Sequence, residues 1–170
     1  PFRLELLQGT LKGPRMDWLV EKATELGVDA VRAVTTQYSV AGDRPDRWAR
    51  VAQAALKQSG NLRIPELPEA VPLAEAIAAL PPQFHGFLLS PAAEEGLSAA
   101  IGAALPDGKG TLVLAIGPEG GFSPEEEKLL ENRGFRPCRL SAQILRGETA
   151  ALVAASVALH TLEFGCTAEL

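Results

Sequence analysis

The stretch TLVLAIGPEGGFSPEE, residues 111–126, decides the fold class of this chain of 170 residues. Its first part, residues 111–116, is an almost unbroken apolar run, which is typical of a parallel strand covered on both faces. Near its end, Ser123 is a helix N-cap residue, Pro124 suits the first helical position and Glu126 completes a capping box. A helix therefore begins there. A strand, a glycine-rich loop and a helix in this order predict the repeating unit of an α/β fold.

The same alternation continues on both sides of this stretch. Apolar residues at helical spacing predict helices, and short valine-rich or apolar runs predict strands. The helices are expected at residues 15–26 and 45–59, in an alanine-rich segment ending at Leu80, in one reaching Leu105, and at residues 124–134 and 148–164. The other strands are expected at residues 28–34, 84–89 and 135–140. The alternation predicts an α/β fold with a mostly parallel sheet and helices on both faces.

Composition predicts one compact domain in the cytoplasm. Of the residues, 46% are hydrophobic, which allows a core that needs no disulfide support. The two cysteines, Cys138 and Cys166, are far apart and have no partner spacing, so neither a disulfide framework nor a zinc site is expected. We find neither a membrane-length apolar run nor a signal-peptide pattern.

Charge is unevenly distributed along the chain. The net charge is -5, yet residues 1–65 carry ten Lys and Arg against seven Asp and Glu. Residues 66–170 carry six against fourteen. A polyanion should therefore meet the first third of the chain, unless these cations belong only to solvated helix faces. The candidate RNA contacts are Lys12, Arg15, Lys22, Lys57 and Arg63.

Three loops are candidates for a ligand site. In a parallel sheet, ligands bind beyond the carboxyl ends of the strands, here after Leu89, Ile116 and Leu140. The glycines of residues 117–122 allow a ligand to approach the backbone closely, although such a turn also serves as a plain connection. The loop matches neither the dinucleotide-binding nor the P-loop pattern, which disfavours NAD and ATP as ligands.

Four motifs carry a family resemblance. The segments IGPEGGFS (116–123) and ILRGETA (144–150) form a pair, and KATELGV (22–28) and QSG (58–60) precede them. In this order they resemble the ribosomal RNA small-subunit methyltransferase E family, of the SPOUT superfamily. The resemblance implies a SPOUT fold with a C-terminal trefoil knot, a homodimer, S-adenosylmethionine as cofactor, and methylation of N3 of a 16S rRNA uridine. A SPOUT enzyme acting on another rRNA or tRNA nucleotide, or a non-catalytic RNA-binding module, are the alternatives.

The resemblance also implies which residues bind the cofactor. They lie in the three loops and at the start of the last helix: Leu89, Ser90, Ile116, Gly117, Pro118, Gly120, Leu140, Ser141, Ile144, Leu145 and Thr149. The chain departs from the family where Ser141-Ala142-Gln143 replaces Gly-Pro-Arg, where Gly147 replaces threonine and where Asn61 replaces arginine. Members usually carry an N-terminal PUA-like RNA-binding domain. This chain begins at Pro1, where that domain would end, so we expect residues 1–170 to be the catalytic domain alone.

The chemistry requires stabilisation of a uridine anion, because N3 must lose its imide proton before it accepts a methyl group. Arg146 is the candidate for that stabilisation, unless it pairs with Glu148 or contacts a helix end. Glu119 is the candidate that accepts the proton or attracts the sulfonium, with capping of the helix at Ser123 as its alternative. No metal is expected. The alanine-rich last helix, with its close-packing small residues, is expected to form the dimer interface.

Overall fold

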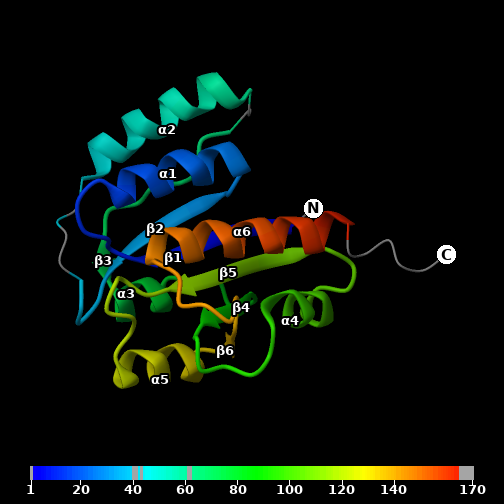
Figure 1. The fold of residues 1–170 in the computed structure, drawn as a ribbon. Helices are drawn as coiled ribbons and strands as arrows, with labels where there is room; N and C mark the ends of the chain where they lie inside the picture. Colours follow the sequence, from blue (N-terminus) through cyan, green and yellow to red (C-terminus); the bar gives the residue numbers. More distant parts are fainter. Residues whose placement is uncertain (1, 40–41, 43, 61–62, 165–170) are drawn as a thin grey trace.

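The computed structural model describes residues 2–39, 42, 44–60 and 63–164, and it contains one sheet of six parallel strands (Figure 1). In spatial order, β3-β2-β1-β5-β4-β6, the strands are Val71–Pro72, Ala30–Thr35, Phe2–Gly9, Gly110–Ile116, His85–Leu89 and Phe135–Cys138. All five strand pairings are parallel. The predicted α/β class with a mostly parallel sheet is confirmed.

Helices cover both faces of this sheet. One face carries α1 (Arg15–Leu26), α4 (Leu97–Ala104) and α6 (Gly147–Phe164), and α2 (Pro45–Ser59) packs on α1 as an outer layer (Figure 1). The other face carries α3 (Leu73–Ala78) and α5 (Pro124–Asn132). No described helix has the length and apolarity that crossing a membrane requires. The C-terminal trefoil knot stays a prediction.

Strand β5 and the start of α5 form as their sequence predicts. Leu112 and Leu114 pack under α4 and α6, whereas Val113 and Ala115 face the α3 and α5 side, and all four are fully buried. At the start of α5, the Ser123 hydroxyl accepts a hydrogen bond from the Glu126 N–H at 3.3 Å. The Ser123 N–H donates to Glu126 Oε2 at 2.9 Å, which completes the capping box.

Strand β1, like the two-residue strand β3, is not predicted by the sequence pattern. It runs from Phe2 to Gly9, lies between β2 and β5 in the middle of the sheet, and buries Leu4, Leu6 and Leu7 completely. Glu5 and Gln8 interrupt its apolar pattern, yet both are buried. Arg32 donates to the Glu5 carboxylate and Gln8 Nε2 donates to the Gly117 carbonyl, whereas Gln8 Oε1 has no hydrogen-bond partner among the described residues. No local pattern reveals contacts with such distant parts of the chain.

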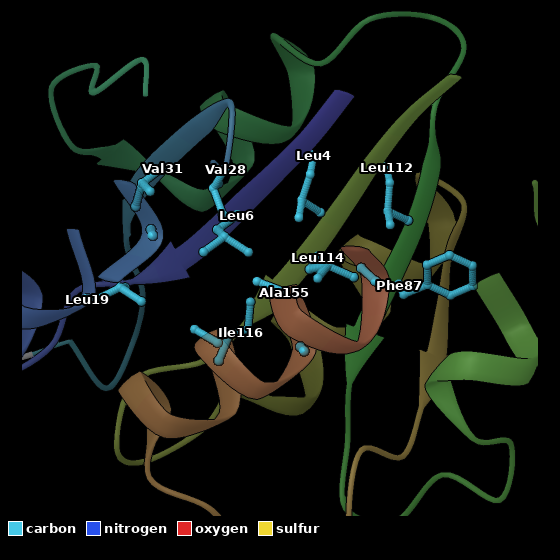
Figure 2. Packing of buried hydrophobic residues seen from close by; sticks show 14 of the residues in the cluster. Leu4, Leu6, Leu19, Val28, Val31, Phe87, Leu112, Leu114, Ile116 and Ala155 are labelled. Carbon is cyan, nitrogen blue, oxygen red and sulfur yellow. The ribbon is translucent and has the colours of Figure 1, made fainter. Parts of the chain in front are cut away.

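The alanines of α6 pack against the sheet, so their expected role as the dimer interface is wrong. Ala151, Ala154, Ala155 and Ala158 are fully buried within the chain. Figure 2 shows Ala155 beside Leu114 and Ile116 of β5. Small side chains let the helix approach the strands closely, so these four alanines are not available to a partner.

A buried carboxylate joins β1 to β2. Glu5 Oε1 accepts a hydrogen bond from Arg3 Nε, and Glu5 Oε2 accepts one from Arg32 Nε, both at 2.6 Å. Glu66 pairs with Arg3 Nη2 at 2.9 Å. Burial alone would raise the pKa of Glu5, but the bonds from Arg32 and Arg3 outweigh burial and lower that pKa below its usual value.

Replacing this carboxylate should weaken the fold in a pH-dependent way. Glu5→Gln should lower the free energy of unfolding at neutral pH by about 1–3 kcal/mol, because an amide cannot neutralise two guanidinium groups. The lowered pKa of Glu5 means that its charged form stabilises the fold above the usual carboxyl pKa, and that this contribution is lost as the pH falls. The difference between wild type and variant should therefore shrink between about pH 5 and about pH 3. Urea unfolding across this range measures it, and a constant difference would contradict the ion-pair account.

Candidate functional site

The three candidate loops meet in one cavity at the carboxyl edge of the sheet. The cavity has a volume of about 440 Å³. It is lined by Leu89, Ser90, Pro91, Ile116, Gly117, Pro118, Glu119, Gly120, Gly121, Leu140, Ser141, Gln143, Ile144, Leu145, Arg146, Gly147 and Ala150. Segments about 50 residues apart in the sequence thus form one site, as parallel strands place their ends on one edge.

The cavity brings together nearly all the residues predicted to bind a cofactor. Only Thr149 of that set does not line it; Ala150, the next residue of α6, does. The lining also includes Pro91, Gly121, Gln143, Gly147 and Ala150, which the sequence does not single out. All five lie in or directly beside the three predicted loops.

Close backbone packing gives the glycine loop its shape. Gly121 has a φ of +74°, and its N–H donates to the Pro118 carbonyl at 2.9 Å, closing a tight turn. A Cβ on Gly117 would lie 2.8 Å from the Gly121 backbone. A Cβ on Gly9, at the end of β1, would lie 2.5 Å from Pro118 Cδ. The loop therefore needs glycine at both of these positions.

Gln8 supports this loop from below and is missed by sequence reasoning. Its side chain is fully buried at the end of β1. Its Nε2 donates to the carbonyls of Gly9 at 2.8 Å and Gly117 at 3.3 Å. Gly147 also lies here, because a Cβ on it would be 3.2 Å from the Gly117 oxygen. One buried amide thus ties β1 to the glycine loop, with the start of α6 packed against them.

Glu119 faces the cavity as a paired anion. Its Oε1 accepts hydrogen bonds from the Lys12 N–H at 3.0 Å and from Arg15 Nη1 at 2.6 Å. Burial would raise the pKa of Glu119, but the backbone N–H groups and Arg15 outweigh burial and lower that pKa. Glu126, not Glu119, caps α5, so the capping alternative for Glu119 is wrong. The carboxylate is held ionised at the cavity wall.

Arg146 has no carboxylate partner within the part of the chain that the structure describes. Its side chain is exposed and lines the cavity, and its carbonyl accepts the Ala150 N–H at 2.8 Å as α6 begins. The alternative of a pair with Glu148 is wrong, since Glu148 pairs with Arg15 at 3.5 Å. The guanidinium charge is therefore free for a ligand.

The predicted RNA contacts divide into two groups. Lys22 pairs with Glu21 and Glu25, and Arg15 pairs with Glu119 and Glu148. The side chains of Lys12, Lys57 and Arg63 are exposed, with no ion pair to any described residue. Only this second group carries unneutralised charge.

Cys138 and the two histidines, His85 and His160, do not line the cavity. Cys138 is a buried free thiol at the end of β6, while Cys166, like Asn61, lies outside the described residues. Among the residues that the structure covers, no three His, Cys, Asp or Glu side chains are grouped to hold a metal ion.

The sequence profile of the RNA methyltransferase domain family matches residues 1–159. The chain belongs to this family. Its relatives in the family include the ribosomal RNA small subunit methyltransferase E of Bacillus subtilis, which is 30% identical over 96% of this chain and 68% of that protein. The resemblance that the four motifs indicate is thereby confirmed.

Solved structures of RNA methyltransferases agree with this assignment. A ribosomal RNA small subunit methyltransferase E from Neisseria gonorrhoeae, bound to S-adenosyl methionine, is 30% identical and superposes with a TM-score of 0.86. The match covers 96% of this chain and 68% of that one. The SpoU methyltransferase AviRb from Streptomyces viridochromogenes shares the fold, with a TM-score of 0.61 at 16% identity over 98% of this chain and 62% of that one. The predicted SPOUT fold is confirmed.

Proposed function

We propose that this chain is the catalytic domain of an S-adenosylmethionine-dependent methyltransferase that modifies N3 of a uridine in 16S rRNA. The observation that carries the proposal is the cavity formed by the three loops, in a chain 30% identical to an enzyme solved with this cofactor. The name of the Bacillus relative supports small-subunit ribosomal RNA as the substrate.

The cavity fits the proposed cofactor in size and chemistry. Its volume of about 440 Å³ lies within the usual range of small-molecule sites. Leu89, Ile116, Leu140 and Leu145 offer apolar surface, and the glycines expose backbone polar groups beside them. These residues, with Ser90, Ser141 and Ile144, would hold the nucleoside and amino-acid parts. When bound, the cofactor supplies an activated methyl group on a sulfonium.

In this proposal, the charge of Arg146 acts on the uridine and the charge of Glu119 acts on the cofactor. Arg146 holds the uridine oxygens O2 or O4 and stabilises the negative charge that appears when N3 gives its imide proton to solvent water. Glu119, with its lowered pKa, is a weak base, so its ionised carboxylate suits attraction of the sulfonium better than proton removal. The proposed site therefore presents a free cation to the uridine and a fixed anion to the cofactor.

The RNA backbone is proposed to meet a basic surface on and after α2. Arg50 and Lys57 are seven residues apart, so they lie on the same outward face of the helix, and Arg63 follows it. We call these three residues the α2 basic surface. Arg50 Nε donates to the Asp46 carbonyl at 3.2 Å, and within the described part of the chain Arg50 forms no ion pair. Lys12 adds a further exposed cation on the segment before α1.

The dimer is proposed to form through the outer face of α6 instead of its alanine face. A groove of about 470 Å³ lies there, lined by Ser98, Leu152, Val153, Ser156, Val157, His160 and Thr161. Val153 is 39% exposed and lies in this groove with the apolar side chains of Leu152 and Val157. A second copy of the chain would cover this apolar surface by two-fold packing.

Cofactor binding and Arg146 provide the direct test of the enzyme. Calorimetry should show binding of S-adenosylmethionine and its demethylated product, but not of NAD or ATP. Arg146→Ala should slow methyl transfer by roughly a hundredfold and leave cofactor affinity within a few-fold, because the guanidinium acts on charge that develops during transfer. Lysine should rescue poorly, since it lacks the planar two-point contact.

Single-turnover transfer to small ribosomal subunits, with cofactor binding in parallel, separates the alternatives. If Arg146→Ala lowers the transfer rate and the cofactor affinity equally, Arg146 is a cofactor-binding residue. Methylation of another nucleotide would change the substrate but keep the enzyme, and cofactor binding without transfer to any RNA would favour a non-catalytic module.

The α2 basic surface predicts a change in the salt dependence of RNA binding. Charge reversal of Arg50, Lys57 and Arg63 should weaken binding and reduce the slope of log affinity against log salt by about 0.7–0.9 for each phosphate that is no longer neutralised. Lys109→Glu and Lys128→Glu, both exposed and far along the acidic part of the chain, are the matched controls. Equal effects at the controls would place the RNA elsewhere.

The outer face of α6 predicts the oligomeric state. Sedimentation velocity at tens of micromolar should show a dimer for the wild type. Val153→Arg should give a monomer, because a charge buried in an apolar interface costs several kcal/mol. Leu129→Arg, at a side chain of similar exposure on α5, should stay dimeric. A dimer that survives Val153→Arg would exclude this face.

A further inference from the structure

One arginine joins three segments that are distant in the sequence. Arg15 is the first residue of α1. Its Nη1 lies 2.6 Å from Glu119 Oε1 in the loop after β5, and its Nε lies 3.5 Å from Glu148 Oε1 at the start of α6. A single guanidinium therefore connects α1 to the glycine loop and to the last helix.

The two carboxylates belong to different walls of the cavity. Glu119 lines it directly, between Pro118 and Gly120. Glu148 is 8% exposed and follows the lining residue Gly147. Oε2 of Glu148 is buried and has no hydrogen-bond partner among the residues described. Within these residues, Arg15 is the one ionic contact of the Glu148 carboxylate, through Oε1. The position of Arg15 thus fixes how far apart the two walls stand.

The ion pair between Arg15 and Glu119 is partly exposed, so it differs from an ion pair buried in the core. The side chains of Arg15 and Glu119 are 34% and 31% exposed. Ion pairs at such exposure are screened by water and salt, and most contribute little to the free energy of unfolding. Water and salt do not remove the effect of these contacts on geometry, because the positions of both carboxylates depend on the guanidinium that they contact. The Arg15–Glu119 pair should therefore shape the cavity more than it stabilises the fold, whereas the pair with the buried Glu148 also contributes to stability.

We propose that Arg15 is a positioning residue of the cofactor cavity, which holds the glycine loop and the start of α6 at the separation that S-adenosylmethionine fits. This inference rests on the proposed function. It also reassigns Arg15, whose charge suggests a phosphate contact from the sequence alone. With its charge balanced by two carboxylates, Arg15 has little left to offer a phosphate.

The two candidate roles of Arg15, a phosphate contact and a positioning residue, predict different results in an experiment without RNA. A phosphate contact affects the KM for RNA and the salt dependence of binding, but not the affinity for the cofactor. A positioning residue affects the cofactor affinity of the free protein. Calorimetric titration with S-adenosylhomocysteine, in the absence of RNA, reads only the second effect.

The experiment compares the wild type with Arg15→Ala, Arg15→Lys, Glu119→Gln and the double variant Arg15→Ala/Glu119→Gln. Arg47→Ala is the matched control, since Arg47 also forms a 2.6 Å ion pair with α1, through Asp17, but neither residue lines the cavity. Thermal unfolding of each ligand-free variant is measured in parallel.

Arg15→Ala should weaken S-adenosylhomocysteine binding by about tenfold, as expected when a charge-assisted hydrogen bond is removed. Arg15→Lys should recover part of the affinity, because an ammonium group keeps the charge but lacks the planar guanidinium fork that reaches Glu119 and Glu148 from two different nitrogens. Arg47→Ala should stay within about twofold of wild type. The double variant should bind about as weakly as the weaker single variant, since Arg15 acts partly through Glu119.

Each outcome decides the proposal. If Arg15→Ala binds within twofold of a wild type that does bind, the positioning role is wrong and the proposed function stands. If the wild type does not bind S-adenosylhomocysteine, both the positioning role and the proposed function are wrong. An effect confined to the KM for RNA would return Arg15 to the phosphate contacts and overturn the inference. If Arg15→Ala does not fold, Arg15→Lys and Glu119→Gln decide, and unchanged affinity in both overturns it.

Discussion

The site depends on how closely the end of β1 approaches the glycine loop. Gly9 makes this approach possible, because Pro118 Cδ occupies the space where any Cβ would lie. At the start of α6, a Cβ on Gly147 would meet Leu11 Cδ2, the tip of a flexible side chain, at 2.8 Å, so this position is less restricted than Gly9. With a side chain on Gly9, the strand and the loop would separate, and the walls of the cavity would no longer face each other. The buried amide of Gln8 then holds the glycine loop against β1 by hydrogen bonds.

Charge is distributed around this packed junction in an asymmetric way. At its edge, the partly exposed Glu119 and the buried Glu148 share Arg15, and the buried Glu5 farther along β1 has Arg3 and Arg32. A buried carboxylate needs such a partner because desolvation of an unpaired charge is costly. Arg146 is exposed, so it stays hydrated and needs no partner in the free protein. The structure thus pairs these three carboxylates with arginines and leaves the Arg146 cation for a ligand.

The features that sequence predicts are those whose signal is local. The apolar run at Leu112–Ala115 and the Ser123 capping box lie within a few residues, and both form as expected. Strand β1 is missed because the burial of Glu5 depends on Arg32, and that of Gln8 on Gly117, 109 residues away. The small residues of α6 indicate close packing but not which surface receives it, and the sheet does. Family motifs identify the cavity loops, whereas the ion partners that decide the state of Glu119 and Arg15 appear only in three dimensions.

The same distribution of charge would orient an RNA on the acidic protein as a whole. Arg47 of α2 pairs with Asp17 of α1, so both helices start at the carboxyl edge, where the cavity lies. Lys57 follows ten residues later, about 15 Å along the axis of α2. A backbone that contacts the α2 basic surface therefore extends from that edge, whereas residues 66–170, which carry fourteen acidic side chains, repel it. Repulsion elsewhere disfavours wrong orientations without requiring further contacts, so a net negative chain can still present one face to RNA.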